Sequence, residues 1–153
     1  MRTFPFLVLV VFVVASEAKV FRKCELASLL ENRFRLSRDE IKNWVCIAEY
    51  ESSFNTATIN DKNRNKSTDY GIFQINNKYW CDNNYGKNVC GIACSELLSD
   101  DITTSLRCAQ TVRRDTEKFS GYKAWVAYNR KCKNRNLDQY MAECWYTRPN
   151  IFP

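Results

Sequence analysis

Apolar residues repeat every three or four positions in three segments of the chain, which is the period of an amphipathic helix. The first segment predicts a helix over residues 24–32. The second is predicted to start at Ser37, where a capping box is completed by Glu40, and to end near Glu51. The third is predicted to be capped by one of the two aspartates at 100–101. The apolar positions that define the three helices are Leu26, Leu29, Leu30 and Phe34; Ile41, Trp44, Val45 and Ala48; and Ile102, Leu106, Ala109 and Val112.

Between and after these helices the pattern changes. Residues 55–70 are rich in Asn, Thr, Asp and Ser and contain two short β-prone pieces, which predicts hairpins. Residues 77–95 are predicted to form an irregular loop held by cysteines. Short helical pieces are expected at 124–129 and 137–144. The order helix, helix, hairpins, helices indicates an α+β fold whose small sheet forms one wall of a cleft.

The first 18 residues have the organisation of a secretory signal peptide. Arg2 is followed by an apolar run from Phe4 to Val14, and small residues flank the cleavage point. This run is too short for a stable bilayer-spanning helix, and no later run approaches that length. We therefore expect a secreted protein without a membrane anchor, with one domain over residues 19–153. Two prolines predict that the tail, residues 145–153, is irregular.

Charge and composition narrow the possible chemistry. The formal net charge is +6, and removing the signal peptide takes away one arginine and one glutamate, so the charge is kept. A basic secreted protein favours anionic partners such as bacterial surfaces, although the charge could equally serve solubility alone. No run of Lys or Arg suggests nucleic-acid binding. The chain has no histidine, which excludes Ser-His-Asp and Cys-His systems, so any acid or base must be carboxylic.

All eight cysteines follow the signal peptide. An even number in an oxidising compartment predicts four disulfides, and spacing alone leaves roughly a hundred pairings open. A metal cluster is the alternative, but Cys90 and Cys94 are the only close pair and no histidine supports them. We therefore expect neither a metal nor a cofactor.

Two carboxylic residues stand out as an acid and base pair. Glu51 lies near the end of the second predicted helix, and Asp69 follows close enough to share one cleft with it. Two carboxyl groups facing each other in a polar and aromatic setting suggest acid chemistry on a sugar. Considered singly, Glu51 would be interpreted as a solvated charge and Asp69 as a turn residue.

Longer segments around these residues carry a family resemblance. AEYESSFNT, STDYGIFQIN, NNKYWC and KAWVAYNRKC, with the start KVF...CELA, the segment SDDIT and the cysteine spacings, closely resemble the c-type lysozymes. The resemblance covers residues 19–144. It implies a helical lobe and a small antiparallel β-sheet lobe on either side of a substrate cleft. It also implies the disulfide pairs Cys24–Cys144, Cys46–Cys132, Cys81–Cys94 and Cys90–Cys108.

The resemblance also implies roles for individual residues. Glu51 occupies the position of the general acid, and Asp69 that of the nucleophile or charge stabiliser. Trp125 would form an apolar wall that keeps the proton on Glu51 to higher pH, whereas nearby amides would keep Asp69 ionised. The amides are those of Asn63, Gln74 and Asn76. Sugar contacts are implied for Asn76, Tyr79, Trp80, Ala124 and Val126, with core packing as the alternative for Trp80 and Trp125. Trp44 and Tyr128 are assigned to the core.

The implied activity is that of a secreted, monomeric muramidase, which hydrolyses the β-1,4 bond between N-acetylmuramic acid and N-acetylglucosamine in peptidoglycan. Two alternatives are a lysozyme-like glycan-binding protein without turnover and a calcium-binding relative of the α-lactalbumins. The calcium loop would need more carboxylates than this chain has, because Ser99, Thr104 and Ser105 occupy the corresponding positions. The basic charge favours defence over digestion.

Three features depart from the usual family pattern. Tyr79 stands where many relatives have tryptophan, the segment between Cys81 and Cys90 is short, and the tail beyond Cys144 is long. Asn65 also begins an Asn-Lys-Ser sequon on a predicted hairpin tip near the cleft. We expect a glycan there, if present, to restrict large substrates.

Overall fold

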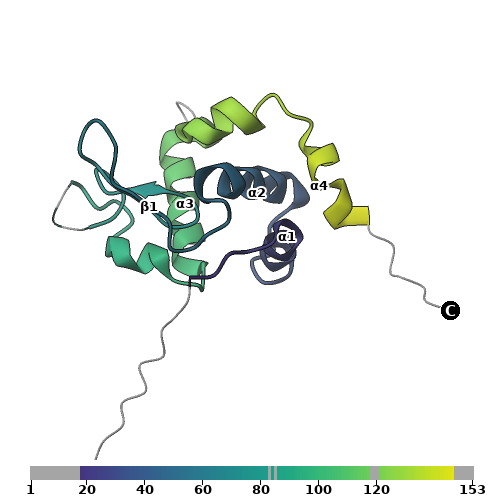
Figure 1. Cartoon of the computed structure of the whole chain (residues 1–153), viewed down its shortest axis with the longest axis horizontal. Helices are drawn as coiled ribbons and strands as arrows, with labels where there is room; N and C mark the ends of the chain where they lie inside the picture. Colours follow the sequence, from purple (N-terminus) through teal and green to yellow (C-terminus); the bar gives the residue numbers. More distant parts are fainter. Residues whose placement is uncertain (1–17, 83, 85, 118–120, 147–153) are drawn as a thin grey trace, which may run out of the picture.

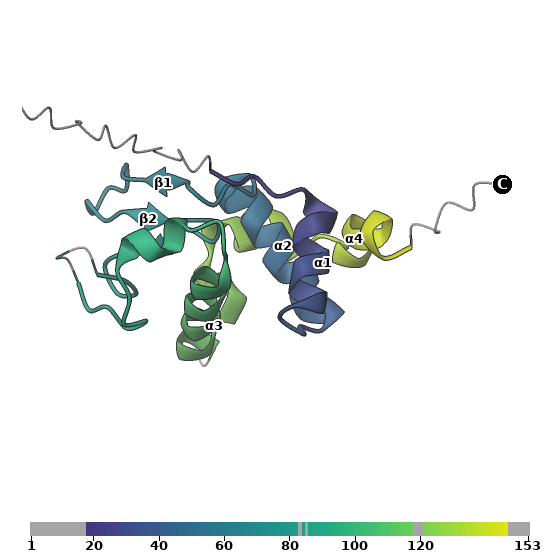
Figure 2. The ribbon, with the colours of Figure 1, turned by 90° about the horizontal axis from the view of Figure 1, so that it is seen from below.

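The computed structural model describes residues 18–82, 84, 86–117 and 121–146. These residues form a helical lobe and a small sheet, which lie at opposite ends of the molecule in Figures 1 and 2. The α-helices are α1 Lys23–Asn32, α2 Arg38–Ser52, α3 Thr103–Glu117 and α4 Leu137–Tyr146. None of the helices in this described part combines the length and apolar character needed to cross a bilayer. The predicted signal peptide, except for Ala18, and most of the predicted tail lie outside the described residues.

Helix α2 is the centre of the fold and sets the position of Glu51. The backbone N–H of Glu40 donates to the Ser37 hydroxyl, as the capping box predicts. The helix ends at Ser52 because Ser53 adopts a left-handed φ of 50° and the N–H of Phe54 donates to the carbonyl of Ala48 at 3.2 Å. Glu51 therefore lies in the last turn, next to the sheet.

Three two-residue strands form the antiparallel sheet, in the order β1 Ile59–Asn60, β2 Asp69–Tyr70 and β3 Ile75–Asn76. The hairpin predicted within residues 55–70 is confirmed, but strand β3, which lies beyond this range, was not predicted. Gly71 makes the turn between β2 and β3, with a φ of +78°, and a Cβ there would lie 2.0 Å from the carbonyl oxygen of Leu97. This turn requires a glycine.

The shorter helical elements differ from their predictions. A 3₁₀ helix, η1 Cys94–Leu98, begins in a region predicted to be irregular. The piece predicted at 124–129 is divided into a 3₁₀ turn, η2 Gly121–Ala124, and a π-helical turn, η3 Tyr128–Cys132. Trp125 lies between them. Helix α4 continues through Trp145 and Tyr146, so the prediction of irregular structure from residue 145 is wrong for these two residues. Trp145 packs against the core, whereas Tyr146 is exposed.

The core surrounds Trp44 of α2, which is fully buried as predicted. Its ring meets those of Phe73, Tyr122 and Trp125 edge-on, at centroid distances of 5.5, 5.0 and 5.3 Å. Tyr128 is only partly buried and packs against this core from outside, which corrects the prediction that it is a core residue. The core thus reaches from α2 to the cleft through Trp125.

Four disulfides connect the same pairs that the resemblance implies. Cys24–Cys144 joins α1 to α4, and Cys46–Cys132 joins α2 to η3. Cys81–Cys94 and Cys90–Cys108 hold the segment between the sheet and α3. Covalent links therefore replace regular structure where that segment has little of it.

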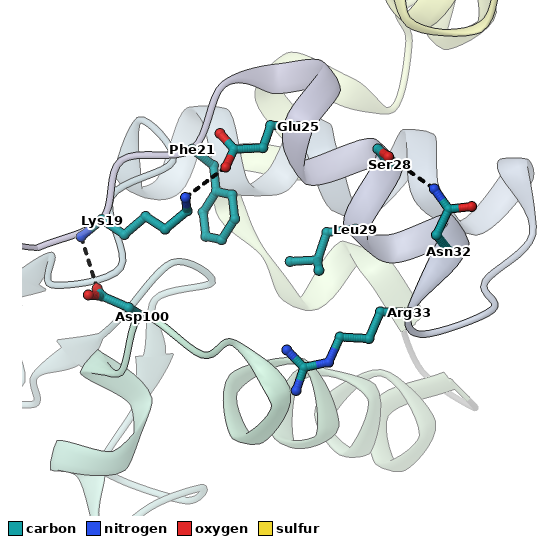
Figure 3. A pocket seen from close by; sticks show the side chains of 8 residues that line it. All are labelled: Lys19, Phe21, Glu25, Ser28, Leu29, Asn32, Arg33 and Asp100. Carbon is teal, nitrogen blue, oxygen red and sulfur yellow. Dashed lines mark hydrogen bonds and ion pairs between the residues drawn. The ribbon is translucent and has the colours of Figure 1, made fainter.

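A hollow lies where the N-terminal segment, starting at Lys19, meets helix α1 and Asp100 (Figure 3). The main-chain nitrogen of Lys19 donates to the carboxylate of Asp100 at 2.9 Å, and the Thr56 hydroxyl donates to the same oxygen at 2.8 Å. The side chain of Lys19 pairs with Glu25 at 2.7 Å. These contacts tie the start of the domain to the segment that precedes α3.

Candidate active site

A hollow of about 600 Å³ lies between the end of α2 and the sheet. It brings Glu51 of α2 and Asp69 of β2 together on facing walls. The other lining residues are Asn60, Asn63, Gln74, Ile75, Asn76, Tyr79, Trp80, Val112, Ala124, Trp125 and Val126. Every residue expected to bind substrate therefore lines the hollow, and Asn60, Ile75 and Val112 are additions that the sequence analysis missed.

The two walls are joined by hydrogen bonds to consecutive carbonyl groups. The Ser52 hydroxyl donates to the carbonyl of Ile72 at 2.8 Å, and the indole N–H of Trp125 donates to that of Phe73 at 2.9 Å. Ser52 and Trp125 are both buried. Buried hydrogen bonds of this kind are costly to break because an unpaired carbonyl remains. They fix the position of Glu51 and of the Trp125 wall relative to the β2–β3 turn.

Glu51 has an environment that favours its neutral form. Its side chain is half-buried, and burial raises the pKa of the carboxyl group above its ordinary value. The N–H of Ala127 donates to Oε1 at 3.2 Å and lowers the pKa in part, while the nearby charge of Asp69 raises it. Burial is the largest of these effects, so Glu51 holds its proton to higher pH than an exposed glutamate.

Asp69 instead receives hydrogen bonds from three asparagine side chains. Asn63 donates to Oδ2 at 2.8 Å, Asn76 to Oδ1 at 2.7 Å and Asn60 to Oδ2 at 3.3 Å. The strand register explains two of them, because Asn60 and Asn76 are the direct partners of Asp69 on β1 and β3. Donors to an ionised oxygen stabilise its charged form.

Two expectations about these amides need correction. Asn60 was missed, although a hairpin within residues 55–70 could have suggested it once the register was known. Gln74 was expected to bond Asp69, but its amide donates to the carbonyls of Thr58 and Gly71 at 3.0 and 2.9 Å. Gln74 therefore lines the hollow and stabilises the β2–β3 turn through these two hydrogen bonds, and its own backbone adopts a left-handed φ of 49°.

Ser67 forms a second layer behind Asp69. Its hydroxyl is buried and accepts hydrogen bonds from the side chains of Asn63 and Asn76 at 3.3 and 2.7 Å. It donates to the Oδ1 atom of Asn65 at 2.6 Å. Ser67 therefore orients the two amides that bind Asp69 most closely, and the exposed Asn65 completes this arrangement.

Aromatic side chains form the rest of the cleft. Tyr79 is 42% exposed and lies 6.5 Å from Trp80 between ring centroids. Trp125 is only 5% exposed, so it belongs to the core and also lines the cleft. Ala124 and Val126 on either side of it are exposed at the edge. A polar hollow with flat aromatic faces suits a pyranose chain.

The described residues offer little for a metal. Outside the cleft, the closest group of potential ligands is Cys24, Cys144 and Glu143, but the two sulfur atoms are bonded to each other. Within the cleft, the carboxyl groups among the lining residues are those of Glu51 and Asp69.

Comparisons with known proteins identify the family of this chain. The C-type lysozyme/alpha-lactalbumin family model matches residues 19–144. Lysozyme C of Penaeus merguiensis is 67% identical over 158 residues, covering 100% of this chain and 99% of the relative. Lysozyme C-1 of Mus musculus is 46% identical over 136 residues, covering 86% and 90%. The crystal structure of a lysozyme from Litopenaeus vannamei has 72% identity and a TM-score of 0.82, covering 85% of this chain and 100% of that one. The chain belongs to the C-type lysozyme/alpha-lactalbumin family.

Proposed function

We propose that this chain is a secreted muramidase that hydrolyses β-1,4 bonds between N-acetylmuramic acid and N-acetylglucosamine in peptidoglycan, with Glu51 and Asp69 as its catalytic residues. The observation that carries the proposal is the contrast between the two carboxyl groups of one cleft. Burial favours the neutral form of Glu51, whereas the carboxyl group of Asp69 accepts hydrogen bonds from three amide donors. These two roles are the ones generally assigned to the carboxyl pair of lysozymes.

In the first step, the carboxyl group of Glu51 donates its proton to the glycosidic oxygen as the bond to the anomeric carbon breaks. Asp69, on the opposite wall, attacks or stabilises the positive charge that develops on that carbon. Water then attacks the anomeric carbon and gives its proton to Glu51, and any bond that Asp69 has formed to that carbon breaks in this step, which restores the starting state. Asn63 and Asn76 hold Asp69 in position and leave it available to the sugar.

The aromatic part of the cleft supports substrate binding. Tyr79 and Trp80 offer ring faces to the sugars, and Ala124 and Val126 offer main-chain groups beside the Trp125 wall. Tyr79 is smaller than the tryptophan that many relatives have, so we expect weaker stacking at this end of the cleft. No cofactor takes part in the reaction.

The biological setting is part of the same proposal. Residues 1–18 are the signal peptide, and the remaining chain is a secreted monomer that acts in antibacterial defence. Its net charge of +6 attracts it to anionic bacterial surfaces. Asn65 is exposed, and its sequon places any glycan next to the β-side of the cleft. A glycan there would hinder cross-linked cell wall more than short oligosaccharides.

The test compares wild type, Glu51→Gln and Asp69→Asn in lysis of purified cell wall and in binding of N-acetylglucosamine oligomers. We expect lysis by wild type and a loss of about 10²- to 10⁴-fold in Glu51→Gln, because general acid catalysis contributes that much. Binding should persist in both variants. Binding without turnover in wild type would instead identify a glycan-binding protein, and the proposal would be wrong.

A further inference from the structure

Two lysines flank the exposed aromatic residue at one end of the cleft. The Nζ atom of Lys78 lies 5.4 Å from the centroid of the Tyr79 ring, and that of Lys87 lies 5.8 Å from it. Both distances are within the range of a cation–π contact. Tyr79 lines the cleft whereas the two lysines do not, so the ammonium groups lie at its rim.

The backbone fixes this arrangement. The N–H of Lys87 donates to the carbonyl of Lys78 at 3.1 Å, and the N–H of Val89 donates to that of Tyr79 at 2.7 Å. Gly86 has a φ of +80°, and a Cβ there would lie 2.0 Å from the carbonyl oxygen of Lys78. Only glycine allows the two segments to approach this closely. Lys87 is therefore held beside Tyr79 by main-chain contacts.

The positive charge of the two lysines is not neutralised by the described part of the chain. Neither forms an ion pair with a described carboxylate, whereas Lys19, Lys23 and Lys42 each do. The acidic residue nearest in sequence is Asp82, whose Oδ1 atom accepts from the N–H of Asn84 at 2.8 Å. Two ammonium groups that have no carboxylate partner among the described residues, beside an exposed ring, are suited to a ligand that combines a sugar face with a negative charge.

We propose that Lys78 and Lys87, together with Tyr79, form a subsite for an acidic saccharide, in which the two ammonium groups bind the free lactyl carboxylate of an N-acetylmuramic acid unit without a stem peptide, while its ring packs against Tyr79. This inference rests on the proposed function, because it assumes that a glycan occupies the cleft. It adds a basis for selecting charged over neutral glycans. Stacking alone does not distinguish them, because both present similar ring faces.

The experiment uses two saccharides of equal length, a neutral oligomer of N-acetylglucosamine and an alternating oligomer with free N-acetylmuramic acid carboxylates. Affinities are measured by titration calorimetry in the Glu51→Gln background, so that no turnover interferes. Lys78→Gln and Lys87→Gln are compared with Lys133→Gln, which removes the same charge from an exposed position outside the cleft. Lys87→Arg keeps the charge and serves as the conservative variant.

We expect each Gln variant at the rim to weaken binding of the acidic saccharide about two- to fivefold, as exposed ion pairs do. Binding of the neutral saccharide should stay the same. The effect should shrink in 0.5 M salt, where the screening length falls to a few ångströms. Lys133→Gln should have no selective effect, and Lys87→Arg should retain most of the preference.

Equal weakening for both saccharides would mean that the lysines only orient Tyr79, and the inference would be wrong. No change for either saccharide would overturn it as well. Hydrolysis by the chain with native Glu51, measured in parallel on the same saccharides, tests the proposed function separately. If neither saccharide binds, the cleft is not a glycan site and both proposals fail.

Discussion

The helical wall and the sheet wall of the cleft give their carboxyl groups opposite surroundings. Glu51, at the end of α2, is half-buried and has one main-chain donor, Ala127. Asp69, in the middle strand, has three side-chain donors within 3.3 Å. A helix end packed against a core removes water from its side chain, whereas short paired strands place polar neighbours on both sides of a residue. The difference shows how one small domain can hold an acid and an anion in one cleft.

The contrast between the two walls depends first on the asparagine side chains that donate to Asp69. In the double variant Asn63→Ala with Asn76→Ala, Asp69 loses its two closest hydrogen-bond donors, at 2.8 and 2.7 Å. We expect kcat on cell wall to fall about a hundredfold, since charge-assisted hydrogen bonds are each worth about 1.5–3 kcal/mol. Asn60→Ala should have a smaller effect because its bond is longer. Steady-state kinetics measures both, with thermal unfolding as the control for folding.

Gln74→Ala provides the contrasting variant on the same wall. The amide of Gln74 bonds the turn and not Asp69. We therefore expect Gln74→Ala to lower the melting temperature, while kcat stays close to that of wild type. If Gln74→Ala reduces kcat as much as the asparagine variants at equal stability, the assignment of donors is wrong.

The helical wall depends on Trp125. In Trp125→Phe, part of the burial of Glu51 is lost together with the hydrogen bond to Phe73. Because burial raises the pKa of Glu51, its loss should lower that pKa toward the ordinary value. The acid would then lose its proton at lower pH, so the alkaline limb of the kcat profile should move to lower pH. The unpaired carbonyl should cost about 1–3 kcal/mol of stability. An unchanged alkaline limb would contradict the role of burial.

The two walls also differ in how far the sequence predicted them. The helical wall followed from apolar periodicity and the capping box at Ser37, which specify α2 and thus the place of Glu51. The sheet wall was predicted only in outline, because strands of two residues give no period to detect. Asn60 was missed and Gln74 misplaced for this reason, since both depend on register and on the left-handed turn. Glu51 and Asp69 were paired because of their closeness along the chain and their polar and aromatic setting, but their individual roles rested on the family resemblance, because neither residue is distinctive alone.

The short helical turns around Trp125 and η1 show a second limit of predicting structure from sequence. Their turns are 3₁₀ and π-helical, and disulfides and core packing decide them more than local propensity does. Cys94 and Trp125 are both buried, so their surroundings come from residues distant in sequence. The apolar residues of α3 were predicted correctly because they repeat within one helix.

A contact far from the cleft should affect stability and leave both walls unchanged. In Asp100→Ala, Lys19 and Thr56 lose a shared acceptor. We expect the protein to lose about 1–2 kcal/mol, as partly buried hydrogen bonds do, with no shift in the pH profile of kcat. Asp100→Asn keeps an acceptor oxygen and should lose less. A shifted pH profile in Asp100→Ala would show that this junction reaches the cleft.

The smallest effect is expected in the stability of Glu51→Gln. The raised pKa of Glu51 means that the folded state binds its proton more tightly than the unfolded state, whose carboxyl has the ordinary value of 4.5. Stability of the wild type should therefore fall as pH rises from 4.5 through the folded pKa. Glutamine does not titrate and can still accept the N–H of Ala127. Glu51→Gln should thus be more stable than wild type at pH 7, and the difference should disappear below pH 4.5.

Thermal unfolding of the two proteins at pH 7 and pH 3.5 measures this difference. Asp115→Asn, which neutralises an exposed carboxylate on α3, is the matched control, and its difference from wild type should not follow the same course with pH. A Glu51→Gln protein that is less stable than wild type at pH 7 would mean that the Glu51 charge is favourable in the fold. The contrast between the two walls would then have another cause, because burial would no longer explain why one carboxyl group keeps its proton.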